Sequence, residues 1–244
     1  MTELELTKMV EKSKRWAVEA HAGQKDKAGE DYFTAHVSVV ARGVNGDPVA
    51  EAVAYLHDTV EDTTITMEDI QAEFPKEVAD AVDVLTRWKG MSYAEYIWRV
   101  RQNPIATKVK MSDLRSNMDL TRLPYPPTQK DILREVKYLR AYKMLDGRIS
   151  ATTVNPYALY EYLLANGWVP KEEKKYNNEA PVILTPLSGT VTITVPLDMT
   201  AVDYDTLIRH ALNKLSLYES KEIQSVLETV IEWKPECTSN MNSL

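Results

Sequence analysis

An apolar segment that leads directly into a group of charged residues limits most strongly how this chain can fold. Residues 52–56 read Ala-Val-Ala-Tyr-Leu, and the segment HDTVED follows at once as residues 57–62. A helix that is apolar on every side is buried. The fold must therefore place one imidazole and three carboxylates at the edge of its core.

The charged segment needs a compensating partner. If the helix persists, His57 shares a face with Glu61, and Asp58 shares one with Asp62. Burying unpaired carboxylates costs several kcal/mol even after relaxation, and a divalent cation is a common solution where histidine and acidic ligands meet. The alternative is that these acids lie on a solvated helix end, which is the more frequent outcome for an isolated His-Asp pair.

Asp113 is a second acid on an apolar stripe. The spacing predicts a helix from Pro104 to Met118, in which Ala106, Val109, Asp113 and Asn117 follow one another at helical intervals. Asp113 then faces the core and needs a partner. Pairing at the surface with Lys110 or Arg115 is an equally good interpretation of Asp113 alone.

His36 is the third candidate ligand. It lies among valines on a helix predicted over residues 34–42. A lone histidine on an apolar helix is more often a hydrogen-bonded core residue than a ligand. In combination with His57, Asp58 and Asp113 it completes a mixed nitrogen and oxygen set, which suits a divalent metal ion.

Composition favours helices and excludes several classes of protein. The chain has 244 residues, 8 glycines, one cysteine and a formal net charge of −7. The single cysteine, Cys237, permits neither an intrachain disulfide nor a cysteine zinc cluster. An acidic chain is a poor partner for long nucleic acid, and no run reaches the roughly 18 apolar residues of a membrane span. We expect a cytoplasmic protein that does not bind membranes.

Helical periodicity and turn residues predict a mainly α fold followed by a small α+β region. The expected N-terminal helices cover residues 4–21, 34–42, 50–57, 67–73, 75–87, 92 onward, 104–118 and 128–145. After Gly147 we expect a helix over 157–166, a linker or hairpin at 171–178, β-type runs at 181–187 and 190–196 joined at Ser188-Gly189, and helices over 201–216 and 220–233. The domain boundary is predicted near residue 150, which gives domains of residues 1–150 and 151–244.

Three stretches together resemble one family. They are HAGQKDKAGEDYFTAH (residues 21–36), AYLHDTVEDTT (54–64) and VKMSDLRSNM (109–118). Their order and spacing resemble the HD superfamily of metal phosphohydrolases, and most closely the hydrolase domain of the Rel/Spo alarmone enzymes and the small alarmone hydrolases. The resemblance covers about residues 5–145.

The resemblance implies an HD-domain helical bundle around one divalent metal ion, commonly Mn²⁺. It implies that His36, His57, Asp58 and Asp113 are the metal ligands and that Glu61 and Asp62 orient or deprotonate the attacking water. The expected reaction is removal of the 3′-pyrophosphate of the nucleotide (p)ppGpp. Candidate substrate contacts are Lys27, Tyr32, Asn117, Lys110 and Arg115, with Tyr32 as a base-stacking candidate because it lies in the loop before His36.

Departures from the family pattern keep alternatives open. The family loop commonly carries Arg-Lys where this chain has Asp26-Lys27, and an acid there is expected to repel a phosphate. Ser116 replaces a frequent histidine. A different HD-type nucleotidase or nucleotide triphosphohydrolase, and a non-catalytic HD module that binds a nucleotide or partner, therefore remain alternatives. Arg115, Arg122, Lys137 and Arg140 could bind outer phosphates, although each of them, taken singly, is more often a surface charge.

The sequence assigns no chemistry to residues 151–244. We expect a small accessory domain, and a role for it in homo-oligomer formation or substrate gating is a hypothesis. The expected partner of the whole chain is a small nucleotide.

Overall fold

The computed structural model describes residues 1–148, 150–171, 181–187 and 189–233. The chain divides into two compact units. The first comprises Met1–Lys89 and Arg99–Leu145, and the second comprises Gly90–Trp98 and Asp146–Leu244. Residues 90–98, which the sequence assigns to the first domain, thus belong to the second unit. The functional division into residues 1–150 and 151–244 stays a prediction.

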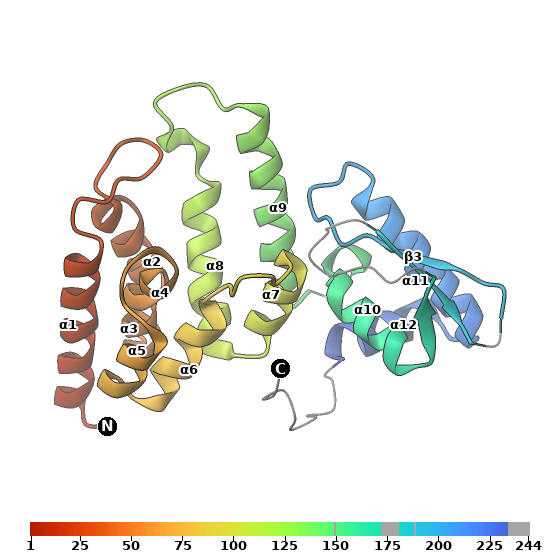
Figure 1. Ribbon diagram of the computed structural model, residues 1–244, viewed down its shortest axis with the longest axis horizontal. Coiled ribbons are helices and arrows are strands. Elements are labelled where there is room, and N and C mark those ends of the chain that lie inside the picture. Colours follow the sequence, from red (N-terminus) through yellow and green to blue (C-terminus); the bar gives the residue numbers. More distant parts are fainter. Residues whose placement is uncertain (149, 172–180, 188, 234–244) are drawn as a thin grey trace. The chain divides into compact units, whose positions relative to one another are not determined.

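The first unit is built from helices (Figure 1). They are α1 (Glu3–Ala20), the π-helical turn η1 (Phe33–Val37), α2 (Ser38–Arg42), α3 (Pro48–Leu56), α4 (Thr59–Asp62), α5 (Met67–Glu73), α6 (Lys76–Leu85), α8 (Pro104–Met118), the 3₁₀ turn η2 (Leu120–Arg122) and α9 (Gln129–Leu145), while α7 (Tyr93–Arg101) spans the division between the units. The prediction of a helical bundle is confirmed for this region.

Helix α3 is the centre of the first unit. Asp47 caps its start by accepting a hydrogen bond from Ala50 N at 3.1 Å, and Pro48 occupies the first turn, where its missing N–H costs nothing. The side chains of Ala50 and of residues 52–56 are buried, and Glu51 is half-buried. The helix packs against α1, α2, α6 and α8, as its all-round apolar sequence predicts.

The charged segment begins where this helix ends. Helix α3 stops at Leu56, and Asp58 adopts φ −105° and ψ −2°, a conformation between the helical and extended regions. A separate turn, α4, then carries Glu61 and Asp62. The helix does not persist through residue 62, so the face-sharing argument made from a continuous helix does not hold. The break instead turns Asp58 back toward His57.

Helix α8 runs beside α9 (Figure 1) and also contacts α2, α3 and α6. Asn103 caps it by accepting hydrogen bonds from Ile105 N and Ala106 N, both at 3.0 Å. Asp113 is 4 % exposed on the buried side of this helix. The bounds of α8 match those predicted.

The second unit combines helices with a three-stranded sheet. It contains η3 (Ala151–Thr153), α10 (Pro156–Ala165), β1 (Trp168–Pro170), β2 (Val182–Pro186), β3 (Ile193–Val195), α11 (Tyr204–Glu219) and α12 (Ile223–Glu232). The sheet order is β1-β2-β3 with antiparallel neighbours, and Leu184 pairs with Ile193. The predicted β2–β3 hairpin is confirmed, whereas β1 was not predicted. The predicted linker at residues 171–178 lies outside the described residues apart from Lys171. No helix in the described part of the chain is both long and apolar enough to span a membrane.

Candidate metal centre

Four predicted ligand side chains meet inside the first unit. They come from η1, from the α3–α4 junction and from α8. His57 Nε2 lies 3.0 Å from Asp58 Oδ2, and His36 Nε2 lies 3.4 Å from the same oxygen. Asp113 Oδ1 lies 3.2 Å from His36 Nε2 and 3.9 Å from His57 Nε2. One ligand atom each from His36, His57 and Asp58 fit within 4.8 Å of one another.

Both imidazoles are oriented by the hydrogen bond of their other ring nitrogen. His57 Nδ1 donates to the carbonyl of Ala54 at 2.8 Å, which leaves the lone pair of Nε2 facing the acids. His36 Nδ1 hydrogen-bonds Ser116 Oγ at 3.1 Å. Outer partners of this kind fix metal-binding histidines in many proteins. Ser116 therefore orients His36, which the sequence patterns did not predict.

His57 Nε2 provides a direct test of whether a cation fits. This nitrogen is buried and has no hydrogen-bond partner in the described part of the chain. With the proton on Nδ1, it presents a lone pair to the oxygen of Asp58 3.0 Å away. Two electron-rich atoms at this separation repel each other unless positive charge lies beside them. The donor set therefore fits a divalent cation.

Asp113 is held from three sides. Lys110 Nζ lies 2.8 Å from its Oδ2, and Asn117 donates through Nδ2 to its Oδ1. His36 contacts the same Oδ1. Lys110 and Asn117, both predicted substrate contacts, thus also stabilise the acid that the cluster needs.

The protonation preferences of the cluster show the same demand for positive charge. Burial alone would lower the pKa of His36, but its hydrogen bonds to Asp113 and Asp58 outweigh burial and raise the pKa to about 9. Burial also opposes ionisation of Asp58 and Asp113. The neighbouring His57 and His36 nevertheless hold the pKa of Asp58 well below its usual range, and Lys110 and His36 do the same for Asp113. In the absence of a metal, protons on the histidines supply the charge that the carboxylates require.

Glu61 and Asp62 lie on α4, directly after the ligand pair. Glu61 Oε1 accepts a hydrogen bond from Arg87 N at 2.6 Å. Burial, together with the nearby charge of Asp58, raises the pKa of both carboxyls. A carboxylate whose pKa is raised is a better proton acceptor than an ordinary one.

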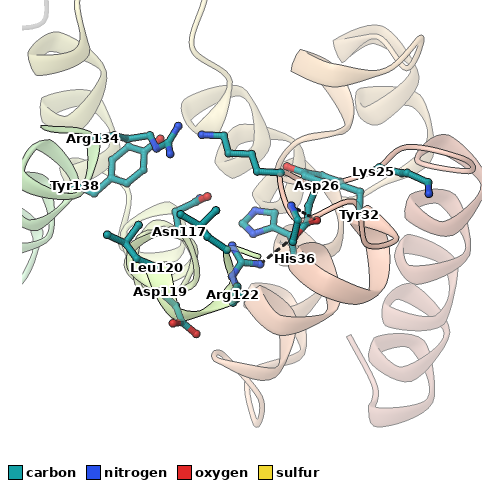
Figure 2. A pocket seen from close by; sticks show the side chains of 13 residues that line it. Lys25, Asp26, Tyr32, His36, Asn117, Asp119, Leu120, Arg122, Arg134 and Tyr138 are labelled. Carbon is teal, nitrogen blue, oxygen red and sulfur yellow. Dashed lines mark hydrogen bonds and ion pairs between the residues drawn. The ribbon is translucent and has the colours of Figure 1, made fainter. Parts of the chain in front are cut away.

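A cavity of about 250 Å³ opens beside the cluster (Figure 2). Its lining comes from the loop before η1, the end of α8, η2 and α9: Lys25, Asp26, Lys27, Ala28, Tyr32, His36, Asn117, Asp119, Leu120, Arg122, Leu123, Arg134 and Tyr138. Among its ionised side chains, four are basic and two are acidic. This excess of basic groups on an acidic chain suits an anionic ligand.

The predicted substrate contacts divide into two groups. Lys27, Tyr32 and Asn117 line the cavity. The hydroxyl of Tyr32 also donates a hydrogen bond to Asp58 Oδ2 at 2.6 Å. Tyr32 therefore contacts the predicted metal ligand Asp58 as well as facing the cavity. Lys110 and Arg115 are absent from the described residues that line the cavity. Arg115 is exposed, and its Nε donates to the carbonyl of Met111 at 3.2 Å.

Sequence patterns did not identify Arg134 and Tyr138 as cavity residues. They lie four positions apart on α9 and therefore share a face, which was the available signal. The structure also weakens the expectation that Asp26 repels a phosphate. Arg122 Nη1 lies 3.5 Å from Asp26 Oδ2, so the charge of this acid is compensated.

Comparison with protein families bears on this region. Residues 14–118 match the family model described as "HD domain". The match includes the four clustered side chains and Glu61 and Asp62. It ends at the last residue of α8, before η2 and α9.

Curated relatives match about half of the chain or somewhat more. A "Probable guanosine-3′,5′-bis(diphosphate) 3′-pyrophosphohydrolase" of Synechocystis sp. is 32% identical over 135 residues, which are 50% of this chain and 18% of that protein. A "GTP pyrophosphokinase" of Streptomyces coelicolor is 27% identical over 158 residues, which are 60% of this chain and 18% of that protein. The chain thus spans less than a fifth of the length of these relatives.

A solved structure, described as a metazoan ortholog of SpoT that hydrolyzes ppGpp, is 22% identical to this chain. The alignment has a TM-score of 0.48 and covers 65% of this chain and 96% of the other.

Proposed function

Because residues 14–118 of this chain belong to the HD-domain family, we propose that the chain is a metal-dependent phosphohydrolase that removes the 3′-pyrophosphate of (p)ppGpp. The observation that carries the proposal is the convergence of His36, His57, Asp58 and Asp113 at the buried Nε2 of His57, which has no hydrogen-bond partner among the described residues. Pairs of imidazoles and carboxylates at such distances bind divalent ions.

The proposed ligands hold one divalent ion, with Mn²⁺ as the preferred metal. When bound, the ion supplies a water of lowered pKa and polarises a phosphoryl oxygen. His57 and His36 contribute neutral nitrogens, whose orientation the carbonyl of Ala54 and the hydroxyl of Ser116 fix. Asp58 and Asp113 contribute the negative charge that a divalent ion requires.

Glu61 and Asp62 act as the proton acceptors in this proposal. The raised pKa of each carboxyl favours proton uptake from water. Arg87 N fixes one oxygen of Glu61 and leaves the other to accept a proton. General-base assistance of this kind contributes roughly 10²–10⁴-fold to the rate.

The substrate assignment is supported by the relatives and by the cavity. The Synechocystis relative is named for cleavage of guanosine 3′,5′-bis(diphosphate) and is 32% identical to this chain over 135 residues. The cavity beside His36 carries Lys25, Lys27, Arg122 and Arg134, which suit a polyphosphorylated nucleotide. We propose that Lys27, Tyr32 and Asn117 contact the substrate. Arg115 is exposed and is no longer proposed as a substrate contact. Lys110 acts through Asp113 in this proposal.

Residues 151–244 are proposed to form a small accessory domain, to which no chemistry is assigned. Homo-oligomer formation and a cytoplasmic location remain predictions. The hypothesis of a role in assembly or gating is tested by deleting residues 151–244. An unchanged oligomeric state and unchanged kinetics of the remaining chain would rule it out.

A substrate panel tests the proposed function. Purified full-length protein with Mn²⁺ is offered ppGpp, pppGpp, deoxynucleoside triphosphates, nucleoside monophosphates and cyclic nucleotides, and released pyrophosphate and phosphate are measured. The proposal expects pyrophosphate from the two alarmones. Turnover of deoxynucleoside triphosphates or monophosphates instead would support another HD-type hydrolase. Saturable nucleotide binding without any turnover would support a non-catalytic module.

A further inference from the structure

We propose that Arg122 is a specificity-determining residue that binds a phosphate group of the substrate remote from the pyrophosphate that is cleaved, and that Asp26 holds Arg122 in place. This inference rests on the proposed function and adds the residue that recognises the second phosphorylated end of its substrate. It concerns the cavity rather than the metal ligands.

Asp26 organises the loop that forms one wall of the cavity. Its Oδ1 accepts hydrogen bonds from Ala28 N and Glu30 N, both at 2.9 Å, and its side chain is 10% exposed. The backbone of the same loop is closed by a bridge between Lys25 and Asp31. Asp26 thus has its Oδ2 left to face the opposite wall.

Arg122 provides that opposite contact. It ends the 3₁₀ turn η2, directly after α8. Its Nη1 lies 3.5 Å from Asp26 Oδ2 and donates to the carbonyl of Ala35 at 3.0 Å. The arginine therefore ties the end of η2 both to the loop and to the turn that carries His36, and Figure 2 shows its guanidinium between these elements.

The guanidinium keeps donors for a ligand. Both contacts use Nη1, whereas Nε is buried without a hydrogen-bond partner in the described part of the chain. An arginine carries five N–H donors in a planar fork, which matches two oxygens of a phosphate. Because Asp26 and Ala35 fix one corner of this fork, little side-chain freedom is lost when an anion binds the other donors.

The two acidic side chains of the cavity already make contacts within the protein, so they do not oppose the binding of an anion by Arg122. Asp26 is paired as described, and Asp119 Oδ1 accepts from Thr121 N at 3.0 Å. Arg134 is already paired with Asp131 at the far wall.

The position of Arg122 separates it from the bond that is cleaved. In the proposed function, the scissile pyrophosphate must lie at the ligand cluster. His36 belongs to both the cluster and the cavity, while His57, Asp58 and Asp113 are absent from the described residues that line the cavity. The cavity therefore leads away from the cluster, and an anion bound at Arg122 is a second phosphate group of the same molecule.

The test compares two substrates that differ at one end. They are guanosine 5′-diphosphate 3′-diphosphate and the matched guanosine 3′-diphosphate with a free 5′-hydroxyl. Full-length wild-type protein is compared with Arg122→Gln, Arg122→Lys and Asp26→Asn, and KM and kcat are measured with Mn²⁺. Arg15→Gln, which removes an exposed arginine from α1, is the matched control for the change in charge.

Arg122→Gln is expected to raise KM for the doubly phosphorylated substrate by about 10-fold or more, since a hydrogen bond to a charged group is lost. KM for the 5′-hydroxyl compound and both kcat values should change less than about twofold on the same reasoning. Arg122→Lys keeps the charge without the fork and should give an intermediate KM. Asp26→Asn keeps the acceptor for Ala28 and Glu30 and should raise KM in the same selective way, by less than Arg122→Gln. Equal changes for both substrates, or a fall in kcat alone, would overturn the proposal.

Binding measurements keep this test separate from the proposed function. If neither substrate is cleaved, the proposed function fails, and calorimetric titration of both compounds into wild-type and Arg122→Gln protein still decides the role of Arg122. The role of Arg122 is supported if wild-type protein binds the doubly phosphorylated compound more tightly than the other compound and if Arg122→Gln abolishes this difference. Equal binding of the two compounds by wild-type protein contradicts it.

Discussion

His57 Nε2 lies 3.0 Å from Asp58 Oδ2, its neighbour in sequence, because helix α3 ends between Leu56 and these two residues. In a continuous helix, adjacent side chains diverge by about 100° and do not face each other. The break at Asp58 brings the two ligand atoms of the pair together. The local backbone conformation, and not a shared helix face, thus brings the proposed ligand atoms of His57 and Asp58 together.

Tyr32→Phe is expected to weaken Mn²⁺ binding while leaving the fold intact. The substitution removes the hydroxyl that donates to Asp58 Oδ2 at 2.6 Å, and it keeps the ring that lies between His21 and His36. Loss of an outer partner of a metal ligand typically costs about 10–100-fold in affinity. Calorimetric titration with Mn²⁺ measures this effect, and Tyr125→Phe, at an exposed tyrosine, is the control. Unchanged affinity in Tyr32→Phe would show that Asp58 does not need this hydrogen bond.

The metal-free protein is expected to lose stability as pH rises from about 6.5 to 9. The pKa of His36 is about 9 in the folded chain, against an ordinary value of 6.5, so its protonated form stabilises the fold fully below 6.5. The loss through pH 9 is on the order of 3 kcal/mol at most. Asp58 and Asp113 have lowered pKa values, so their contribution is present above about 4 and disappears as the solution becomes more acidic.

Thermal unfolding in the presence of a chelator, followed from pH 5 to pH 9.5, checks this dependence. His36→Gln should flatten the decline at alkaline pH, while His210→Gln, at an exposed histidine of α11, should not. A melting temperature that rises between pH 6.5 and 9 in wild-type protein would be inconsistent with a charged His36.

Glu61→Gln and Asp62→Asn separate the proton acceptor from the metal ligands. Each substitution should lower kcat by roughly 10²–10⁴-fold if that carboxylate accepts the proton from water. Mn²⁺ affinity should stay within about threefold of wild type, because neither residue is a proposed ligand. Steady-state kinetics and metal titration on the same preparations give both values. Normal kcat in both variants would leave the reaction without its proposed base.

Gly43→Ala should disturb the cluster from a distance. A Cβ at this position would lie 1.9 Å from Ser112 Oγ, which donates to the carbonyl of Val40 at 2.9 Å. Ser112 must then rotate its side chain or helix α8 must move away from the end of α2, at a cost of about 1–3 kcal/mol. A movement of α8 would carry Asp113 with it, because Asp113 follows Ser112 on the same helix. We expect weaker Mn²⁺ binding and a lower free energy of unfolding.

Ser112→Ala removes the closest of these contacts and should restore part of both losses in the double variant. Denaturant unfolding and metal titration on the four members of the cycle measure the coupling. Strictly additive effects would show that Gly43 and Ser112 act independently.

Much of the first unit follows from local patterns. Pro104 and the cap at Asn103 set the start of α8, and the apolar stripe that includes Val109 predicts that Asp113 is buried. The same reasoning places Ala52–Leu56 in the core. These features depend on neighbours within a few residues, which a sequence displays directly.

Other features depend on contacts between distant parts of the chain. The pairing of Asp26 with Arg122 joins a loop to a turn that follows α8, and no local spacing encodes it. Strand β1, Trp168–Pro170, is too short to show alternation and exists because it pairs with β2. The break after Leu56 was hidden because an acid-rich segment is compatible with a helix.

The stoichiometry of Mn²⁺ binding tests the central claim most directly. Calorimetric titration of wild-type protein should give one Mn²⁺ per chain, and Asp113→Asn should lose at least 100-fold in affinity because one ligand charge is removed. Glu11→Gln, at an exposed acid of α1, should bind like wild type. Mn²⁺ binding that Asp113→Asn leaves unchanged would show that the residues of α8 and the His57-Asp58 pair do not share a metal ion.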